Sequence, residues 1–459
     1  MTFRRFVSWL AKKRLFKLRY LLLYSILLSF FLSVHYWNGR VVTASENGVV
    51  NYFDGERNYF YISDSELHDD TPSSGGHDVR IHSAYYDSRG SGGGESLVRI
   101  FAYVYSLTNA VFCCFQVSGY YTWICTKKVA QRKVLSAKGF PNRSSGSGEP
   151  LEVMFSCAVN ETDFGGLRLT KIMLIGVRNH VVGKLSKSHR ILYPGSRIRS
   201  TKGTRFTVCV LPGGPKQKRR FTTSQDLFEY FELLKLLGTG RVISYYGDRT
   251  VTTVLRRVKD VSQETVVVTS GDVTGSSPLA TNDCLYRSLN SADYVIFLDV
   301  NELLVPNATR DWAAMIASLQ SVHNTTKVGA YVLPVFNFFD ETTNGTASDR
   351  IGLKGPSRGG GASRLKHLPR IVRFRARESK TAPDNAVLGQ PVKIDHITGS
   401  GSIKMLSGYI NVNVPVDYAA VHRFIHDRHI YKGLVIDASK DKFVPLLMRK
   451  LYSLGNIVH

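Results

Sequence analysis

The sequence contains no Cys-x-x-Cys pair, so it lacks the spacing that is typical of zinc ribbons and thioredoxin-like redox sites. It is also poor in acid, because 36 Asp and Glu stand against 60 Lys and Arg, a formal net charge of +24. With 459 residues and 43% hydrophobic side chains it is too apolar for a disordered protein, and it is long enough for one large domain or two. A balance this basic favours a nucleic acid, an acidic membrane or a phosphate-bearing ligand as partner.

The first 19 residues contain seven Lys or Arg and no Asp or Glu. Residues 20–37 contain none of these four residue types, and as an α-helix they would span about 27 Å, enough to cross a bilayer core. The flanking cations predict that the N-terminal end stays cytoplasmic. We therefore expect a cytoplasmic basic tail (1–19) and a transmembrane signal anchor (20–37) of a single-pass type II protein. The alternatives are a cleaved signal peptide, for which 42–44 offers small residues, and a buried core helix.

All five Asn-x-Ser/Thr sequons and all six cysteines follow the expected anchor, on the side that would be lumenal. Disulfides persist in such a compartment, but six cysteines allow fifteen pairings and the sequence does not choose among them. The same topology argues against nucleic acid as a partner, because it would remove the basic segments from access to nucleic acid. The sequons lie at Asn142, Asn160, Asn307, Asn324 and Asn344, and the cysteines at Cys113, Cys114, Cys125, Cys157, Cys209 and Cys284.

The composition divides the remaining chain into segments. Residues 38–78 are polar and rich in Asp, Gly, Ser and Asn, which is typical of a stem or linker. From residue 79 to about 204, short β-branched or aromatic runs separated by Gly and Ser predict a β-rich N-terminal subdomain. We expect the main domain at 205–430 and a C-terminal tail at 431–459.

Strand and helix patterns alternate in the main domain. Residues 205–211 predict a buried strand and residues 222–237 a helix, with Thr222 and Gln225 at capping-box spacing and Gly238 as its end. This order indicates an α/β fold with a mostly parallel sheet covered on both faces, whose ligands bind at the carboxyl ends of the strands. Further strands are expected at 241–246, 265–269, 294–298 and 328–335, and further helices at 250–259, 279–291 and 312–319.

One of these strand ends carries polar side chains. The apolar run at 294–298 leads directly into Asp299, Asn301 and Glu302. Oxygen ligands in this position suit Mg²⁺ or Mn²⁺ bound against a diphosphate, because such ions complete their shell with phosphate oxygens and water. The alternative is that these residues only cap a turn after a buried strand.

The same strand end resembles glycosyltransferase family 92, formerly domain of unknown function 23. The run FLDVNELLVP at 297–306 is similar to the acidic motif of that family, and six other segments match in the same order. Together they span about residues 79–430. The other segments are AYYDSR at 84–89, TVCVLP at 207–212, FEYFELLKLLG at 228–238 with SYY at 244–246, NDCLYR at 282–287, SKTAP at 379–383 with DHI at 395–397, and VHR at 421–423.

The resemblance implies a Golgi membrane enzyme with a GT-A-like, Rossmann-type fold and a lumenal catalytic domain. It would transfer a hexose, usually galactose from UDP-galactose, to a glycan acceptor in an inverting reaction that depends on Mn²⁺ or Mg²⁺. Asp299, Asp283 and Arg287 would bind the donor. The family pattern is Asp-x-Asp-Glu, whereas Asn301 stands at the third position and lacks the second charge beside the cation.

The resemblance also implies further site residues. His396 or His422 would close the metal or diphosphate site that Asp299 and Asn301 begin. An inverting transfer needs a carboxylate that takes the proton of the acceptor hydroxyl. Asp340 and Glu341, just after the strand expected at 328–335, are our candidates for this base, and the alternative is that they form a surface turn beside the Asn344 sequon. Glu302 is a further catalytic candidate.

Two other functions remain open from the sequence. Asn301 favours a catalytically inactive protein of the same fold that binds glycans or acts as a lumenal scaffold. The acidic strand end is also compatible with a phosphate-ester hydrolase, which would release free phosphate or sugar without an acceptor.

Overall fold

The structure is a computed structural model, and the boundaries given below are those it shows. It describes residues 59–62, 79–89, 96–105, 110–120, 122–136, 150–160, 164, 167–178, 181–194, 203–211, 224–245, 265–268, 278–323, 326–339, 376–378, 385–399, 401–425, 434–436, 439 and 441–447. The expected anchor at 20–37 lies outside these residues. None of the helices in the described ranges is long and apolar enough to cross a membrane.

The N-terminal part forms a ten-stranded sheet with the order β1-β5-β4-β8-β10-β2-β3-β7-β6, and β9 pairs with β8. A disulfide joins Cys113 of β4 to Cys157 of β7, two strands that are not neighbours in the sheet. The sheet therefore curls around the core that these strands share. Its strands are β1 (Tyr59–Ile62), β2 (Val79–Asp87), β3 (Ser96–Val104), β4 (Val111–Val117), β5 (Trp123–Thr126), β6 (Gln131–Ser136), β7 (Leu151–Val159), β8 (Leu169–Arg178), β9 (Val181–Lys184) and β10 (His189–Leu192).

The second part is an eleven-stranded sheet that begins with four parallel strands in the order β13-β12-β11-β14. From β14 onward the order continues β18-β16-β17-β23, and these neighbours pair antiparallel. The first four strands are β11 (Phe206–Leu211), β12 (Thr239–Tyr245), β13 (Thr265–Val268) and β14 (Tyr294–Asp299). The others are β15 (Glu302–Pro306), β16 (Val328–Phe339), β17 (Ala376–Glu378), β18 (Asn385–Gly389), β21 (Ile410–Asn413), β22 (Ala419–Ile425) and β23 (Leu434–Ile436).

This architecture shows that the expected fold class was wrong. The protein is mostly β, with curled and mixed sheets, and not an α/β protein of GT-A-like, Rossmann type with a mostly parallel sheet. The strand and helix alternation holds only in the middle of the chain. After β14 the chain turns at once into β15, which pairs antiparallel with β22, and the 12-residue β16 pairs with four different strands.

Most elements predicted between 205 and 335 are present with small shifts in their ends. The helices are α2 (Ser224–Leu236), α4 (Pro278–Arg287) and α5 (Trp312–His323), while the helix expected at 250–259 lies outside the described residues. Gly238 has a φ of 101° and follows α2, as expected for a glycine that ends a helix. Helix α4 stops earlier than predicted, and Asn290 soon after it has a φ of 62°.

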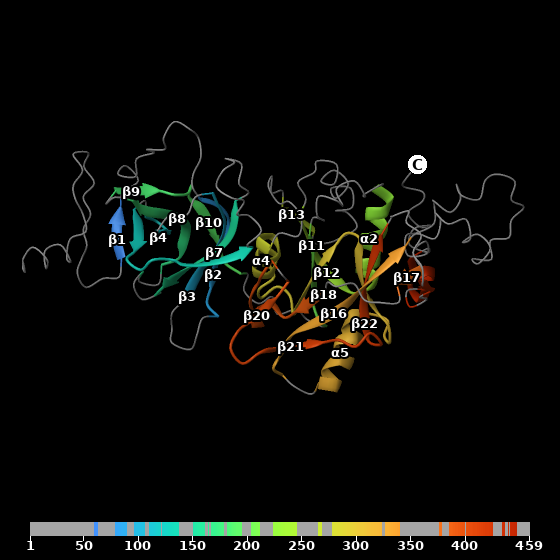
Figure 1. Ribbon diagram of the computed structural model, residues 1–459. Coiled ribbons are helices and arrows are strands. Elements are labelled where there is room, and N and C mark those ends of the chain that lie inside the picture. The colour runs from blue at the N-terminus through green and yellow to red at the C-terminus, as the bar shows by residue number, and fades with distance from the viewer. Residues whose placement is uncertain are drawn as a thin grey trace, which may run out of the picture.

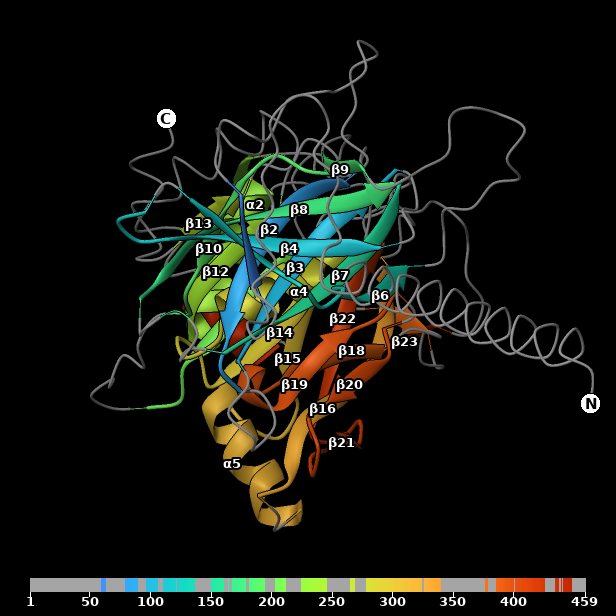
Figure 2. The same cartoon turned by 90° about the vertical axis from the view of Figure 1, so that its left-hand side faces the viewer.

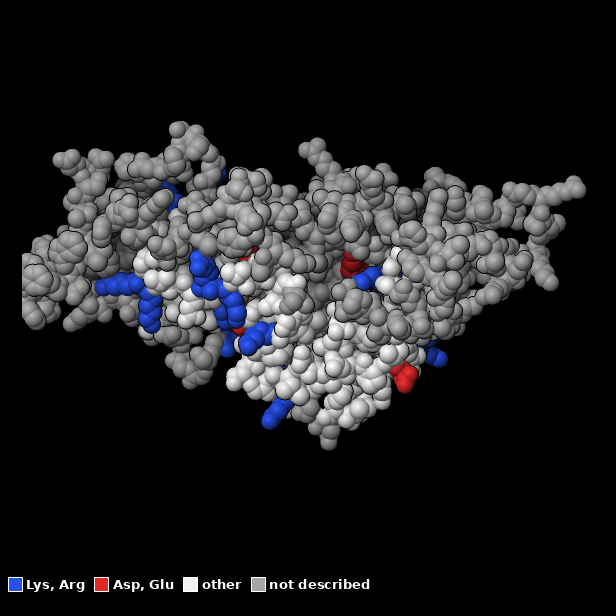
Figure 3. All heavy atoms as spheres, viewed as in Figure 1, with Lys and Arg blue, Asp and Glu red and all other residues white. Residues whose placement is uncertain are grey.

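Helix α4 lies between the two sheets (Figure 1). Its apolar residues belong to a core that includes Tyr85 and Phe101 of the first sheet and Ile243 and Val295 of the second. The view turned by 90° also has α4 directly behind the strands of the first sheet (Figure 2). In Figure 3, Lys and Arg outnumber Asp and Glu over the described part of the visible face, as the composition leads one to expect.

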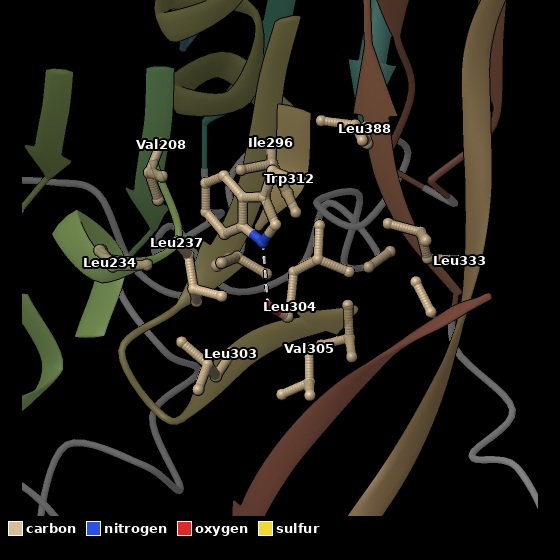
Figure 4. Packing of buried hydrophobic residues seen from close by; sticks show 14 of the residues in the cluster. Val208, Leu234, Leu237, Ile296, Leu303, Leu304, Val305, Trp312, Leu333 and Leu388 are labelled. Carbon is tan, nitrogen blue, oxygen red and sulfur yellow. Dashed lines mark hydrogen bonds between the residues drawn. The ribbon is translucent and has the colours of Figure 1, made fainter. Parts of the chain in front are cut away.

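Trp312 of α5 anchors the core on the other face of the second sheet (Figure 4). Its indole is fully buried, and Nε1 donates a hydrogen bond to the Leu304 carbonyl of β15 at 3.1 Å. The ring packs edge to face on Phe206 of β11. This core fixes β15 against β14, so it also holds the turn that joins them.

Candidate active site

The candidate site is the turn between β14 and β15. Five buried residues of β14 lead to Asp299, which is level with Leu211 at the carboxyl end of the parallel strand β11. The backbone N–H of Asp299 donates to Glu302 Oε2 at 3.0 Å. The hydroxyl of Tyr230, on α2, donates to the Asp299 carbonyl at 3.4 Å. Both the N–H and the carbonyl of Asp299 are thus hydrogen-bonded, and neither of these two bonds uses its carboxylate.

The Asp299 carboxylate is in an unusual environment. Burial raises its pKa to about 7, with a further contribution from the negative charge of Glu302, and nearby backbone N–H groups and Arg423 oppose this only in part. Its Oδ1 is buried and has no hydrogen-bond partner among the described residues. A buried carboxylate oxygen without a partner is unfavourable, and a bound cation would remove that penalty.

The Glu302 side chain and the Asn301 main chain are already engaged within the protein. Both oxygens of Glu302 accept hydrogen bonds, one from Asp299 N–H and one from Arg423 Nε at 2.8 Å. Asn301 is 2% exposed, and its main-chain carbonyl accepts a bond from Phe424 N–H at 2.7 Å. Of the two carboxylates, Asp299 is therefore the one with an oxygen that accepts no hydrogen bond among the described residues.

The described residues contain no group of three or more His, Cys, Asp or Glu side chains arranged to hold a metal ion. Among the described carboxylates, Asp299 provides a buried oxygen that accepts no hydrogen bond. This fits Mg²⁺ or Mn²⁺ bound together with a diphosphate, since such ions take one or two protein carboxylates and fill the rest of their shell with phosphate and water.

The two predicted histidines lie in different places. His422 of β22 is opposite Leu303 of β15 and is stacked on Phe338 at 4.1 Å between ring centroids. It precedes Arg423, so the two side chains point to opposite faces of the sheet. His396 of β19 (Ile394–Ile397), a strand that pairs with β20 (Ile403–Met405), is hydrogen-bonded through Nδ1 to Asp395 at 2.8 Å. Asp395 also pairs with Arg99 of β3, so His396 lies at the contact with the first sheet.

Asp283 and Arg287 of α4 belong to a hydrogen-bonded network around the buried Asp283 carboxylate. The Asp283 carboxylate accepts bonds from the hydroxyls of Tyr85 and Tyr245 at 2.6 and 2.5 Å and from Arg287 Nε at 2.7 Å. Burial acts to raise the pKa of Asp283, but the Arg287 charge and these bonds hold it below its usual range. The carboxylate is occupied by protein groups, and the assignment of both residues to donor binding stays a prediction.

Asp340 and Glu341, the candidates for the base, lie outside the described residues, as do the segments that follow β11, β12 and β13.

Sequence reasoning missed the supporting role of Arg423 and Tyr230. Arg423 belongs to the VHR segment already singled out at 421–423, and strand alternation from His422 would have identified it as the residue on the other face.

One comparison with known proteins identifies a family. Residues 204–429 match the model of glycosyltransferase family 92. No curated protein matches the chain. Among solved structures, the chain is similar to "The Crystal Structure of UDP-glucose pyrophosphorylase complexed with UDP-glucose", with 10% identity, 55% of this chain and 99% of that chain covered, and a TM-score of 0.22. A TM-score this low carries no argument about fold or function.

Proposed function

Because residues 204–429 belong to glycosyltransferase family 92, and the protein is on that ground a glycosyltransferase, we propose that its donor is a UDP-sugar bound with Mn²⁺ or Mg²⁺ at Asp299. UDP-galactose is the proposed donor and a glycan the proposed acceptor. The observation that supports this most is the buried, unpaired Oδ1 of Asp299 at the carboxyl end of β14.

The chain's own residues suit this role. A divalent cation bound with the donor would neutralise the diphosphate as it leaves the sugar. Asp299 would hold the cation with Oδ1, and Tyr230 and Glu302 keep its main chain in place. Because Glu302 uses both oxygens within the protein, we propose a supporting role for it. Asp340 or Glu341 remains the proposed base for the acceptor hydroxyl.

We also propose that the protein is a type II Golgi membrane protein with its catalytic domain in the lumen. The basic tail and apolar run at 1–37 motivate this proposal. It is supported by the pairing of all six cysteines as Cys113–Cys157, Cys114–Cys125 and Cys209–Cys284, since disulfides persist in oxidising compartments.

Titration of the full-length protein with UDP, with and without Mn²⁺, tests the proposed site. We expect UDP to bind at least about tenfold more tightly with Mn²⁺, and Asp299→Asn to remove this difference. Asp293→Asn is the matched control. Asp293 precedes the amino end of the same strand, so its replacement should leave the effect of Mn²⁺ on UDP binding unchanged. Absence of metal-dependent UDP binding in the wild type would refute the proposal.

The second candidate is a catalytically inactive glycan-binding protein, which the asparagine at 301 favours. Incubation of the wild type with UDP-[³H]galactose, Mn²⁺ and a panel of glycans separates the two. Transfer of label to any glycan establishes catalysis, whereas glycan binding without transfer, even with UDP bound, would support the inactive form.

A further inference from the structure

Strand β22 contacts the β14–β15 turn at two points. Arg423 Nε donates to Glu302 Oε1 at 2.8 Å, and the other oxygen of Glu302 accepts the Asp299 N–H at 3.0 Å. One residue further, the Phe424 N–H donates to the Asn301 carbonyl at 2.7 Å. A chain of bonds therefore runs from Arg423 through Glu302 to the main chain of Asp299.

The positive charge of Arg423 stabilises this row of hydrogen bonds. The Glu302 side chain is only 12% exposed, so its negative charge needs a partner close by. If Arg423 were absent, that carboxylate would be expected to turn toward water and release the Asp299 N–H. A displacement of about 1 Å at a ligand-binding carboxylate is enough to reduce activity by about 100-fold.

We propose that Arg423 is a positioning residue, which holds Glu302 so that Glu302 fixes the main chain of Asp299 and aims its carboxylate at the cation of the donor. This inference rests on the proposed function. It assigns Arg423 no contact with the substrate.

The experiment compares full-length wild type with Arg423→Gln, Arg423→Lys and Glu302→Gln. Arg205→Gln is the matched control, because Arg205 pairs with Asp293 at the amino end of β14 and is 23% exposed against 21% for Arg423. Two measurements are made on each protein. The first is backbone hydrogen exchange of a peptide covering residues 294–303 without metal or UDP. The second is the pair of values kcat and KM for UDP-galactose transfer with Mn²⁺.

We expect Arg423→Gln to speed exchange in this peptide by about tenfold or more, since it releases a charge-assisted hydrogen bond. We expect kcat/KM to fall by about 10- to 100-fold, mainly through kcat. Arg423→Lys should restore part of both effects, and Arg205→Gln should change neither by more than about twofold.

The proposal is overturned if Arg423→Gln and Arg205→Gln behave alike in both measurements. Should Arg423→Gln fail to fold, Glu302→Gln decides the same point, because normal exchange and normal kcat in that variant would also contradict the proposal. Wild type without metal-dependent UDP binding would refute the proposed function instead, while the exchange comparison would still decide the role of Arg423.

Discussion

Asp299 has a pKa of about 7 in the folded protein, well above the ordinary aspartate value of 3.8. Between these two pH values the folded state holds the proton more tightly than the unfolded state does. The free energy of unfolding therefore falls as the pH rises from about 3.8 to about 7, and the loss is complete above pH 7. Asp299 thus lowers stability at neutral pH, which is common for residues that serve binding or catalysis.

Asp299→Asn removes this penalty. We expect the variant to be about 1 to 3 kcal/mol more stable than wild type at pH 7.5, with the gain shrinking toward zero near pH 4. Urea unfolding at a series of pH values, with a chelator present, measures the difference. Asp417→Asn, at an exposed turn, is the control and should show no such trend. If Asp299→Asn were less stable than wild type at both ends of the series, the prediction would be contradicted.

Local sequence identified Asp299 because it follows a buried strand directly, and that position is visible in the residue pattern. It did not show that Glu302 is engaged within the protein, since its partner Arg423 lies 121 residues further along the chain. The same holds for Asp283, whose partner Tyr85 is 198 residues away. Motif matching selects polar residues, but the bonds that free or occupy them depend on tertiary contacts.

Two of the disulfides tie elements together over very different lengths of chain. Cys209–Cys284 joins β11 to α4 across a sequence separation of 75, whereas Cys114–Cys125 joins the neighbouring strands β4 and β5 across 11. All four cysteines are fully buried, so replacing each pair by alanines removes similar packing. The comparison therefore isolates the effect of loop length.

We expect Cys209→Ala/Cys284→Ala to lose about 1.7 kcal/mol more stability than Cys114→Ala/Cys125→Ala, from the logarithmic dependence of loop-closure entropy on length. Guanidinium unfolding of both variants gives this difference. Equal losses, or a larger loss for the short loop, would show that strain or packing outweighs the constraint on the unfolded chain.

At the scale of elements, sequence periodicity placed strands and helices within a few residues but did not indicate which strands pair. Residues 294–299 form the expected strand, yet that strand has a parallel neighbour on one side and the antiparallel β18 on the other. Apolar runs in parallel and antiparallel strands look alike when both faces are buried. The mixed sheet, and hence the fold class, could not be read from the alternation at 205–335.

The whole molecule is held together by contacts that cross residue 204, where the family match begins. Arg89, two residues after the end of β2, pairs with Asp87 and donates from Nη1 to the carbonyls of Pro391 and Ile394 at 2.7 and 2.8 Å. Arg99 pairs with Asp395 at 2.8 Å. Arg89 also lies over the ring of Tyr286, a member of the core that α4 shares with both sheets. The predicted boundary between 79–204 and 205–430 therefore runs through a continuous hydrophobic core.

A fragment limited to residues 204–429 would expose one side of that core, including Leu279, Leu285 and Val295. We expect this fragment to lack a cooperative thermal transition and to bind a dye specific for exposed apolar surface, whereas a fragment of residues 79–459 should unfold in one transition. Circular dichroism and dye fluorescence distinguish the two fragments.

In the longer fragment, Arg89→Gln should lower stability by about 1 to 3 kcal/mol, because it leaves two backbone carbonyls without their charged donor. Arg132→Gln, at an exposed position of β6 in the same sheet, should change stability by less than about 0.5 kcal/mol. Cooperative unfolding of the short fragment at the temperature of the long one would show that the first sheet is an independent attachment and that the shared core adds no stability.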